Sequence, residues 1–329
     1  MSIRVIQVGL GGWGQSWFRD VVSQNKAVET VAWVEVAADA LAAAQQRLDL
    51  PRECCFLSLE EALGTVQADA VLITASLPGH VPSARTALLA DKHVLLEKPF
   101  APTLAEALEL VELAEQRGLT LMISQNYRFE PAAQKARELV QQKTLGAVGS
   151  VSIDFRRYAN TAPVETNRHY RIWHPLLVDM TIHHFDLMRM VLGQEPCQVT
   201  CKTWNPIWSN FVEPPAASMA ITFDGGTVVN YRGSWVSHGP STNWAGDWRM
   251  DCEGGEIVWT SRGEMPDKVV LRPSGKLSRS LKLPALELSD RDRNGSLQAF
   301  VESLEKGELP ESSGRDNLKT LALMFAAIQ

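Results

Sequence analysis

Lys98 is the first residue whose type and position could serve catalysis. It follows the segment 93–97, whose central residues are apolar, and precedes Pro99, at what we predict to be the end of a buried strand. Because lysine is rarely buried without a partner, its ammonium group could donate a hydrogen bond to a substrate hydroxyl. It would then stabilise the alkoxide that develops as hydride leaves. The alternative is a surface lysine that pairs with Glu97.

A histidine between two carboxylates forms a second group, in the segment Asp179-Met-Thr-Ile-His183-His184-Phe-Asp186. On an α-helix, Asp179, His183 and Asp186 would share one face, while His184 points elsewhere. A carboxylate one turn before a histidine can fix its tautomer and raise its basicity, which suits a general base near neutral pH. Two alternatives stay open: Asp186 has a purely structural partner, or Asp179 and His183 ligate a metal. We predict no metal, because no third ligand has a diagnostic spacing.

The segment Gly9-Leu-Gly11-Gly12-Trp13-Gly14 fits the G-x-G-x-x-G spacing between a strand and a helix. Such glycines allow a tight turn, a close approach of a pyrophosphate and tight packing of helix on strand, and the helix amino end supplies N–H donors. Glycine-rich turns are common, so the motif alone is weak. Its position after an apolar strand makes it a candidate dinucleotide site.

Glu35 lies near the end of the second predicted strand, where a carboxylate can accept hydrogen bonds from the adenosine ribose hydroxyls. It would repel a 2′-phosphate, and no Arg or Lys occurs at residues 36–39 to bind one. The sequence therefore favours NAD over NADP. The alternative for Glu35 is a solvated strand end.

The elements that must position these groups alternate between strand and helix in the first half of the chain. We predict strands over residues 3–8, 29–36, 70–74, 93–97 and 120–124, and helices over 15–23, 38–48, 59–63, 81–90 and 104–116. This alternation is typical of a doubly wound parallel sheet of the α/β class, whose strands have their carboxyl ends along one edge. Residues 9–14, 74–80, 97–99 and 126–129 all fall at those ends, so we expect the ligand there.

After about residue 145 the pattern changes to consecutive strands joined by tight turns, which indicates a largely antiparallel sheet. We predict strands over residues 150–158, 198–204, 217–223, 227–234, 248–253, 256–259 and 268–272, and helices over 175–192, 296–306 and 317–328. The chain would then consist of a nucleotide-binding domain over 1–124 and an α+β domain over 125–329, whose final helices could pack back toward the first. We expect the site at their junction.

Four motifs together resemble the glucose–fructose oxidoreductase/inositol dehydrogenase family (Gfo/Idh/MocA). They are the glycine turn, Glu97-Lys98-Pro99, Asn126-Tyr127-Arg128-Phe129 and the D-x-x-x-H-x-x-D segment, in the family's order and spacing. The resemblance covers nearly the whole chain. It implies a Rossmann domain, a C-terminal α/β domain with an open, mainly antiparallel sheet, and oxidation of a sugar or cyclitol hydroxyl. It also implies that Lys98 is the active-site lysine, His183 the general base and Asp179 the residue that assists both.

The same resemblance places Asn126 and Arg128 near the active-site cleft and His80 in the loop beside the nicotinamide. We predict cofactor contacts from the strand ends, made by Gly9, Gly11, Gly12, Trp13, Gly14, Glu35, Thr74, Ala75, Ser76, His80, Glu97, Lys98 and Asn126. We predict substrate contacts by Lys98, Arg128, Tyr158, Arg168, His169, Trp173, Asp179 and His183. The alternative for Tyr158, Arg168 and His169 is a solvated loop.

The chain departs from the family pattern on the substrate side. The stretch before the loop histidine is Thr74-Ala-Ser76-Leu-Pro78-Gly-His80, and Trp173-His174-Pro175 replaces a glycine-rich run. These changes leave the chemical groups in place but prevent transfer of a particular sugar specificity. Tryptophans in predicted strands are expected in the core, whereas Trp173, Trp208 and Trp244, in predicted loops, are better placed to meet substrate.

The leading hypothesis is an NAD-dependent dehydrogenase in which His183 takes the hydroxyl proton and Lys98 polarises the oxygen. A second is NAD-dependent glycoside hydrolysis with transient redox chemistry, and a third is a non-catalytic NAD-binding regulator. The presence of Lys98, Asp179 and His183 disfavours the regulator. The substrate itself stays open.

Composition limits the partners. The formal net charge of −6 over 329 residues argues against nucleic acid or an anionic membrane as the main partner. No apolar stretch is long enough to span a bilayer, and the start of the chain lacks signal-peptide features. The five cysteines are odd in number and lack metal-type spacing, which fits reduced thiols in the cytoplasm. We also expect a homo-oligomer, a dimer or tetramer formed through the C-terminal sheet.

Overall fold

The computed structural model describes residues 2–264, 266–284, 287 and 290–329. The chain forms two compact units. The N-terminal unit comprises Met1–Asn126 and Glu287–Leu318, and the C-terminal unit comprises Tyr127–Leu286 and Lys319–Gln329. Within the described ranges, no helix is both long and apolar enough to cross a membrane. All five cysteines are free thiols.

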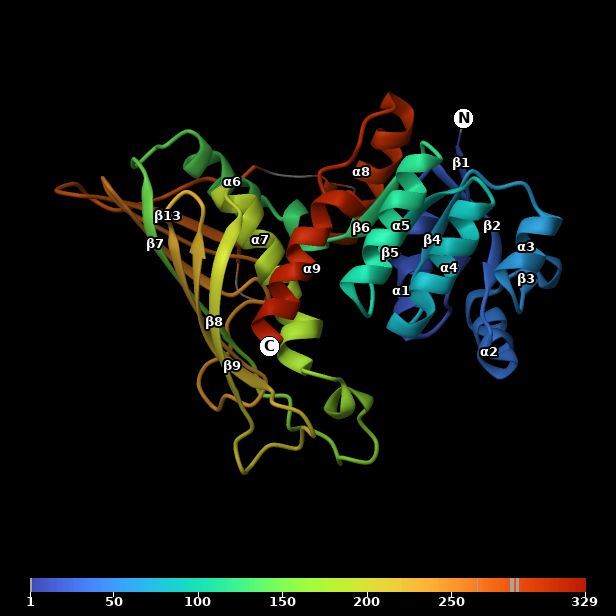
Figure 1. The fold of residues 1–329 in the computed structure, drawn as a ribbon, viewed down its shortest axis with the longest axis horizontal. Coiled ribbons are helices and arrows are strands. Elements are labelled where there is room, and N and C mark those ends of the chain that lie inside the picture. The colour runs from blue at the N-terminus through green and yellow to red at the C-terminus, as the bar shows by residue number, and fades with distance from the viewer. Residues whose placement is uncertain (1, 265, 285–286, 288–289) are drawn as a thin grey trace. The chain divides into compact units, whose positions relative to one another are not determined.

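The N-terminal unit contains a parallel sheet with the strand order β3-β2-β1-β4-β5-β6. This order confirms the predicted doubly wound α/β fold, since the chain winds outward in both directions from β1. Helices α4 and α5 lie side by side on one face of this sheet (Figure 1). The strands are β1 Ile3–Val8, β2 Val28–Val34, β3 Cys55–Phe56, β4 Ala70–Ile73, β5 His93–Glu97 and β6 Leu121–Ser124.

The helices of this unit are α1 Gly12–Asp20, α2 Ala38–Leu48, α3 Leu59–Thr65, α4 Leu77–Leu89, α5 Leu104–Gln116 and α8 Asp292–Lys306. Helix α9, Gly314–Ile328, begins in this unit and continues into the other. Four starts differ from prediction: α1 begins at Gly12 instead of 15, α4 at Leu77 instead of 81, α8 at Asp292 instead of 296, and α9 at Gly314 instead of 317. Pro78 explains the second difference, because proline in the first helical turn presets φ and needs no N–H acceptor. His80 consequently lies in a helix and not in a loop.

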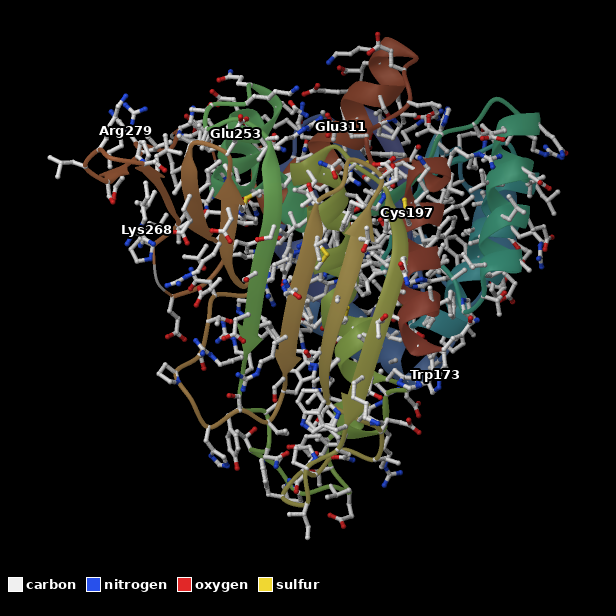
Figure 2. The ribbon with its side chains drawn as sticks, turned by 60° about the vertical axis from the view of Figure 1, so that its left-hand side comes forward. Trp173, Cys197, Glu253, Lys268, Arg279 and Glu311 are labelled. Atoms are coloured by element: carbon white, nitrogen blue, oxygen red, sulfur yellow. The ribbon has the colours of Figure 1, made fainter. Side chains whose placement is uncertain are left out.

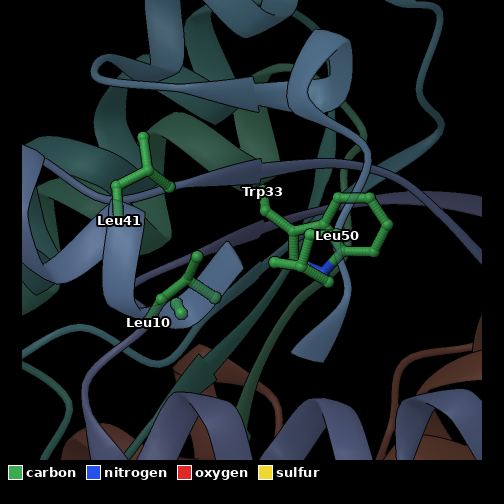
Figure 3. Packing of buried hydrophobic residues seen from close by; sticks show 5 residues of the cluster. Leu10, Trp33, Leu41 and Leu50 are labelled. Carbon is green, nitrogen blue, oxygen red and sulfur yellow. The ribbon is translucent and has the colours of Figure 1, made fainter. Parts of the chain in front are cut away.

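A small apolar cluster holds the glycine turn that follows β1. Leu10, Trp33, Leu41 and Leu50 pack together and are all nearly inaccessible to solvent (Figure 3). Leu10 belongs to the glycine turn itself, and its burial of apolar area therefore stabilises the position of the turn as well as the packing of α2 on the sheet.

The glycine turn is closed by backbone contacts that leave no room for side chains at two positions. Gly9 has φ +91°, and a Cβ there would lie 2.4 Å from the amide nitrogen of Ala75. A Cβ on Gly14 would lie 1.9 Å from the carbonyl oxygen of Gly9. By contrast, a Cβ on Gly11 or Gly12 would meet nothing within 4 Å. Gly9 and Gly14 thus allow close backbone packing, whereas Gly11 and Gly12 leave open space beside the turn.

The C-terminal unit contains an eight-stranded sheet with the order β14-β13-β12-β11-β7-β10-β9-β8, and every pair is antiparallel except β10 with β7. This confirms the predicted mainly antiparallel sheet. Figure 2 looks onto the strands, with helices behind them and a face that no helix covers. The strands are β7 Val148–Arg156, β8 Pro196–Trp204, β9 Ala216–Phe223, β10 Val228–Ser234, β11 Asp247–Cys252, β12 Gly255–Thr260, β13 Lys268–Pro273 and β14 Arg279–Ser280.

The side chains of β9 show why the sheet has two unlike faces. Met219, Ile221 and Phe223 are buried, whereas the intervening residues are exposed. This alternation places apolar side chains against the helices and polar ones on the open face. The helices of the unit are α6 Pro131–Gln141 and α7 Ile182–Leu192, together with the last part of α9. Helix α6 and strand β14 were not predicted.

The prediction of one α-helix over residues 175–192 is wrong in its first part. Leu176–Thr181 forms a π-helical turn, and α7 starts at Ile182. A π turn inserts extra backbone into the helical ladder, so the i, i+4 geometry expected for Asp179 and His183 does not apply through it. Such turns are frequent at functional sites.

His184 is a polar member of the core beneath the sheet. One ring nitrogen lies 2.9 Å from the Tyr231 hydroxyl and the other 2.9 Å from the Trp244 carbonyl oxygen. Burial lowers the pKa of His184 from 6.5 to about 4. The ring is therefore neutral at neutral pH, and its role is structural.

We expect Gly14→Ala to lower the free energy of unfolding by about 3 kcal/mol, because its methyl group would overlap the Gly9 carbonyl and force the turn apart. Urea denaturation measures this change. Gly12→Ala adds the same methyl group where nothing lies within 4 Å, and should alter stability by less than about 1 kcal/mol. Equal stability of the two variants would contradict the described packing.

We expect His184 to make the unfolding free energy fall with acid. Its pKa in the folded chain is below the unfolded value, so its contribution is complete above about pH 6.5 and is lost as the pH falls toward about 4. The loss amounts to about 3 kcal/mol. Denaturation curves of the wild type and His184→Gln over this range isolate the effect, because glutamine does not titrate. Parallel pH dependences would show that the ring is not buried in its neutral form.

Candidate active site

The amino end of α1 offers donors and space for a diphosphate. The first helical hydrogen bond runs from the Gln15 amide to the Gly11 carbonyl, so the amides of Gly12, Trp13 and Gly14 precede the helical ladder. The first turn contains no acidic residue, and Gly11 has no side chain to cap it. With open space at Gly11 and Gly12, the turn fits a bound pyrophosphate group by both shape and polarity.

Glu35 lies just beyond β2 and is oriented by two backbone amides. Its carboxylate accepts hydrogen bonds from the Leu10 amide at 2.8 Å and from the Ala37 amide at 3.2 Å. One end of the glycine turn is thereby tied to the carboxylate that is expected to meet the adenosine ribose. The neighbouring residues 36–39 carry no positive charge that could bind a 2′-phosphate. These features fit NAD.

The residues after β4 contact the glycine turn and stabilise its position. The Thr74 hydroxyl donates to the Gly9 carbonyl at 2.7 Å, and Ser76 is the N-cap residue of α4. His80 is buried, with its ring nitrogens 2.8 Å from the Pro99 carbonyl and 3.0 Å from the Ala75 carbonyl. Burial lowers the pKa of His80. His80 thus connects the loop after β4 with the loop after β5.

Glu97 and Lys98 end β5 at the same edge. Glu97 is buried and accepts a hydrogen bond from Trp17 Nε1 at 2.8 Å and another from the Lys98 amide at 3.1 Å. Burial raises the pKa of Glu97. Trp17 comes from α1, so the helix of the glycine turn and the backbone of Lys98 are joined through one carboxylate. The Lys98 side chain is half-buried.

Residues from the far end of the chain complete this edge. The Asn126 amide donates to the Asp292 carboxylate, and the Arg293 guanidinium lies 4.5 Å from the ring centroid of Trp13. Arg293 also donates to the Ser16 hydroxyl at 3.1 Å. Sequence reasoning missed Asp292 and Arg293, because more than a hundred residues separate them from their partners and no local pattern marks them.

In the C-terminal unit, His183 lies on an aromatic ring. Its imidazole stacks on Tyr127 with centroids 4.1 Å apart and an interplanar angle of 1°. The Arg262 guanidinium lies 4.3 Å from the centroid of the same Tyr127 ring, and its Nη1 donates to the Tyr127 hydroxyl at 3.0 Å. Tyr127 therefore holds the plane of His183 and is itself held by Arg262. Neither Tyr127 nor Arg262 was singled out from the sequence.

The two carboxylates near His183 have different surroundings. Asp186 is buried and receives the Arg128 guanidinium through Nε at 2.6 Å and Nη2 at 2.7 Å. Asp186 therefore has the structural partner that the sequence left open as an alternative. The pair also occupies the Nε and Nη2 donors of Arg128. Asp179 lies in the π turn, with its Oδ2 at 3.4 Å from His169 Nε2. The structure thus groups Asp179 with the predicted substrate residue His169.

The remaining predicted substrate residues lie in and around the loop before the π turn. Tyr158 is exposed, with its ring 4.5 Å from that of His238. Arg168 is exposed in the short 3-10 helix Arg168–Arg171, and Trp173 is exposed with its ring 4.8 Å from His174. Their contacts with substrate stay predictions. Among the described residues, no group of His, Cys, Asp and Glu is arranged to hold a metal.

Two family models match the chain. Residues 3–125 match the model described as the oxidoreductase family with an NAD-binding Rossmann fold, and residues 133–258 match the GFO/IDH/MocA C-terminal domain. Inositol 2-dehydrogenase of Rhizobium meliloti is 24% identical over 338 residues, covering 100% of this chain and 97% of that protein. Myo-inositol 2-dehydrogenase of Thermotoga maritima is 24% identical over 330 residues, covering 99% and 95%.

Solved structures agree with the fold. An oxidoreductase from Agrobacterium radiobacter, in complex with NAD+, L-tartaric acid and magnesium, has a TM-score of 0.86 at 18% identity and covers 100% of this chain and 97% of its own. Aldose-aldose oxidoreductase from Caulobacter crescentus has a TM-score of 0.83 at 20% identity, covering 100% and 98%. The two family matches together cover most of the chain, and the sheets of both units have the expected topology. The chain therefore belongs to the Gfo/Idh/MocA family of NAD-binding oxidoreductases.

Proposed function

We propose that the protein is an NAD-dependent dehydrogenase that oxidises a hydroxyl-bearing carbon of a sugar, cyclitol or sugar derivative. The observation that carries this proposal is the glycine turn, which is open at Gly11 and Gly12 and closed by packing at Gly9 and Gly14. When bound, NAD supplies the hydride acceptor. The relatives named as inositol dehydrogenases support a polyhydroxylated substrate.

In this proposal, His183 accepts the hydroxyl proton at a ring nitrogen. Its stacking on Tyr127 limits rotation of the ring, and a fixed ring plane keeps the accepting lone pair in one direction. Asp179, in the π turn, contributes a carboxylate to the proposed substrate site, where it lies beside His169. Lys98 donates a hydrogen bond to the reacting oxygen and stabilises its developing negative charge.

The preference for NAD over NADP is part of the proposal. Glu35 is held by the amides of Leu10 and Ala37, so it cannot swing away without losing both hydrogen bonds. A 2′-phosphate at this position would face a fixed carboxylate, and like charges at short range disfavour binding.

We further propose that the uncovered face of the C-terminal sheet is the contact between two copies of the chain. This face has a hollow of about 900 Å³, and its lining includes the acidic residues Asp154 and Asp247 and the basic residues Arg156, Arg232 and Arg249. A two-fold contact requires one surface to complement itself, and a face that carries both signs of charge meets that requirement.

Turnover of the site variants tests the proposed chemistry. With a panel of sugars and cyclitols, the wild type should reduce NAD, His183→Gln should lower kcat by about 10²–10⁴-fold, and Lys98→Met by about 10²-fold or more. Nicotinamide absorbance reports each rate. Lys92→Met removes a lysine just before β5 and should leave the rate unchanged. Full activity of Lys98→Met, or cleavage of aryl glycosides without net reduction of NAD, would overturn the assignment.

Light scattering coupled to gel filtration tests the oligomer. The wild type should have at least twice the mass of one chain, and the double variant Arg232→Glu/Arg249→Glu should have the mass of a monomer, because it reverses two charges on the contact face. Arg279→Glu changes an exposed charge on the short edge strand β14 and serves as the control. A monomeric wild type at micromolar concentration would rule out the proposed contact.

A further inference from the structure

Arg157 lies immediately after β7 and faces the helix-covered side of the sheet. Its amide donates to the Ser234 carbonyl at 2.9 Å, and its carbonyl accepts from the Ser237 amide at 3.0 Å, so its backbone is fixed on both sides. Phe155, two residues earlier, points to the same side and lies 5.3 Å from the ring of His184 on α7. The side chain of Arg157 therefore belongs to the side of the sheet on which α7 packs.

The guanidinium of Arg157 lies on an aromatic ring. It is 4.1 Å from the ring centroid of Trp244, whose carbonyl accepts the hydrogen bond from His184. The Nε atom of Arg157 is buried and has no hydrogen-bond acceptor. Burial lowers the pKa of Arg157. The guanidinium therefore has hydrogen-bonding capacity that the described residues do not use, at a cation that has lost part of its hydration.

Three other partly or fully buried arginines of this unit have a carboxylate counter-ion, whereas no described carboxylate pairs with Arg157. Arg128 lies 2.6 Å from Asp186, Arg156 lies 2.9 Å from Asp154, and Arg189 lies 2.7 Å from Glu195. Within the described part of the chain, no carboxylate lies within 4.0 Å of Arg157, and Glu264 acts on it only from a longer distance. A partly buried cation without an anion has lost hydration that no counter-ion replaces. Its retention here points to an anion supplied by a ligand.

Tyr127 relates Arg157 to the proposed base. One face of its ring carries His183 at 4.1 Å, and its phenol is close enough to contribute to the electrostatics of Arg157. Arg262, the other cation beside Tyr127, already donates to the Tyr127 hydroxyl. Arg157 thus has a buried donor, Nε, that no described residue uses, close to the tyrosine that supports the proposed base.

We propose that Arg157 binds a carboxylate group of the substrate, so that the enzyme acts on a polyhydroxy acid such as an aldonate or uronate. The inference rests on the proposed function and specifies its substrate class. The planar donor fork of arginine matches the geometry of a carboxylate, and the Trp244 ring supports the guanidinium from one face. The one positive charge of a guanidinium matches a singly charged carboxylate better than a doubly charged phosphate.

Matched substrate pairs test this assignment. For aldonates against the corresponding alditols, and uronates against the corresponding aldoses, the wild type should show at least about 100-fold higher kcat/KM for the acid. Arg157→Met should remove this preference by lowering kcat/KM for the acid alone, and Arg157→Lys should retain part of it. Arg272→Met, which breaks an exposed pair with Glu256, is the matched control and should behave as the wild type.

Thermal stability with NAD and each acid provides a readout that does not depend on turnover. The acids that bind should raise the Tm of the wild type and of Arg272→Met, but not that of Arg157→Met. A wild type that oxidises neutral polyols as well as acids would overturn the carboxylate subsite and leave the dehydrogenase intact. Preference for sugar phosphates would also overturn it. If no compound is oxidised, the dehydrogenase proposal fails, and the Tm shifts alone then decide whether Arg157 binds carboxylates.

Discussion

The rest of the N-terminal unit depends on the close approach of the turn after β1 to the segment that follows β4. At Gly9 the backbone passes the amide of Ala75, and at Gly14 the helix passes the carbonyl of Gly9, at distances that exclude any side chain. This contact sets the direction of α1, and α1 in turn carries Trp17 to the buried carboxylate of Glu97. Because Glu97 also accepts from the amide of Lys98, the position of the lysine backbone depends on the packing of the glycine turn.

In the C-terminal unit, stacking contacts hold the planar side chains of the candidate site in fixed orientations. His183 lies parallel to Tyr127, Tyr127 is held by Arg262, and Trp244 supports Arg157. Aromatic rings can do this because they offer a large rigid contact area at a small cost in rotamer entropy. His184, next to His183, has its ring bonded to Tyr231 and Trp244 and is part of the support for this arrangement.

Much of the fold could be predicted because burial imposes a period on the sequence. The apolar runs of β1 and β5 and the alternation in β9 each follow from how many faces of the strand are covered. The π turn at Leu176–Thr181 could not be predicted, because its residues have the same apolar periodicity as an α-helix. Helix α6 was missed although its first residue, Pro131, is a helix-start signal.

The candidate site could be proposed from its chemical groups, whereas the partners of those groups were much less predictable. The types and local spacing of Lys98, His183 and Glu35 marked them, since the chemistry of each is carried by one side chain. The pairs Arg128 with Asp186, Asn126 with Asp292 and Tyr127 with His183 join residues far apart in the sequence, and only the folded chain reveals them. Arg157 is the reverse case. Its proposed role as a ligand-binding residue is inferred because the described residues supply no counter-ion for it.

Transfer of a deuterium label tests whether the protein moves hydride from a hydroxyl-bearing carbon to NAD. The wild type is incubated with NAD and with sugars, cyclitols and sugar acids that carry deuterium on their hydroxyl-bearing carbons, and the nucleotide is analysed by mass spectrometry. We expect at least one substrate to pass its label to the reduced nucleotide, and His183→Gln to transfer it at a rate lower by about 10²-fold or more. If no substrate passes its label to the nucleotide, or if His183→Gln transfers it as fast as the wild type, the account is contradicted.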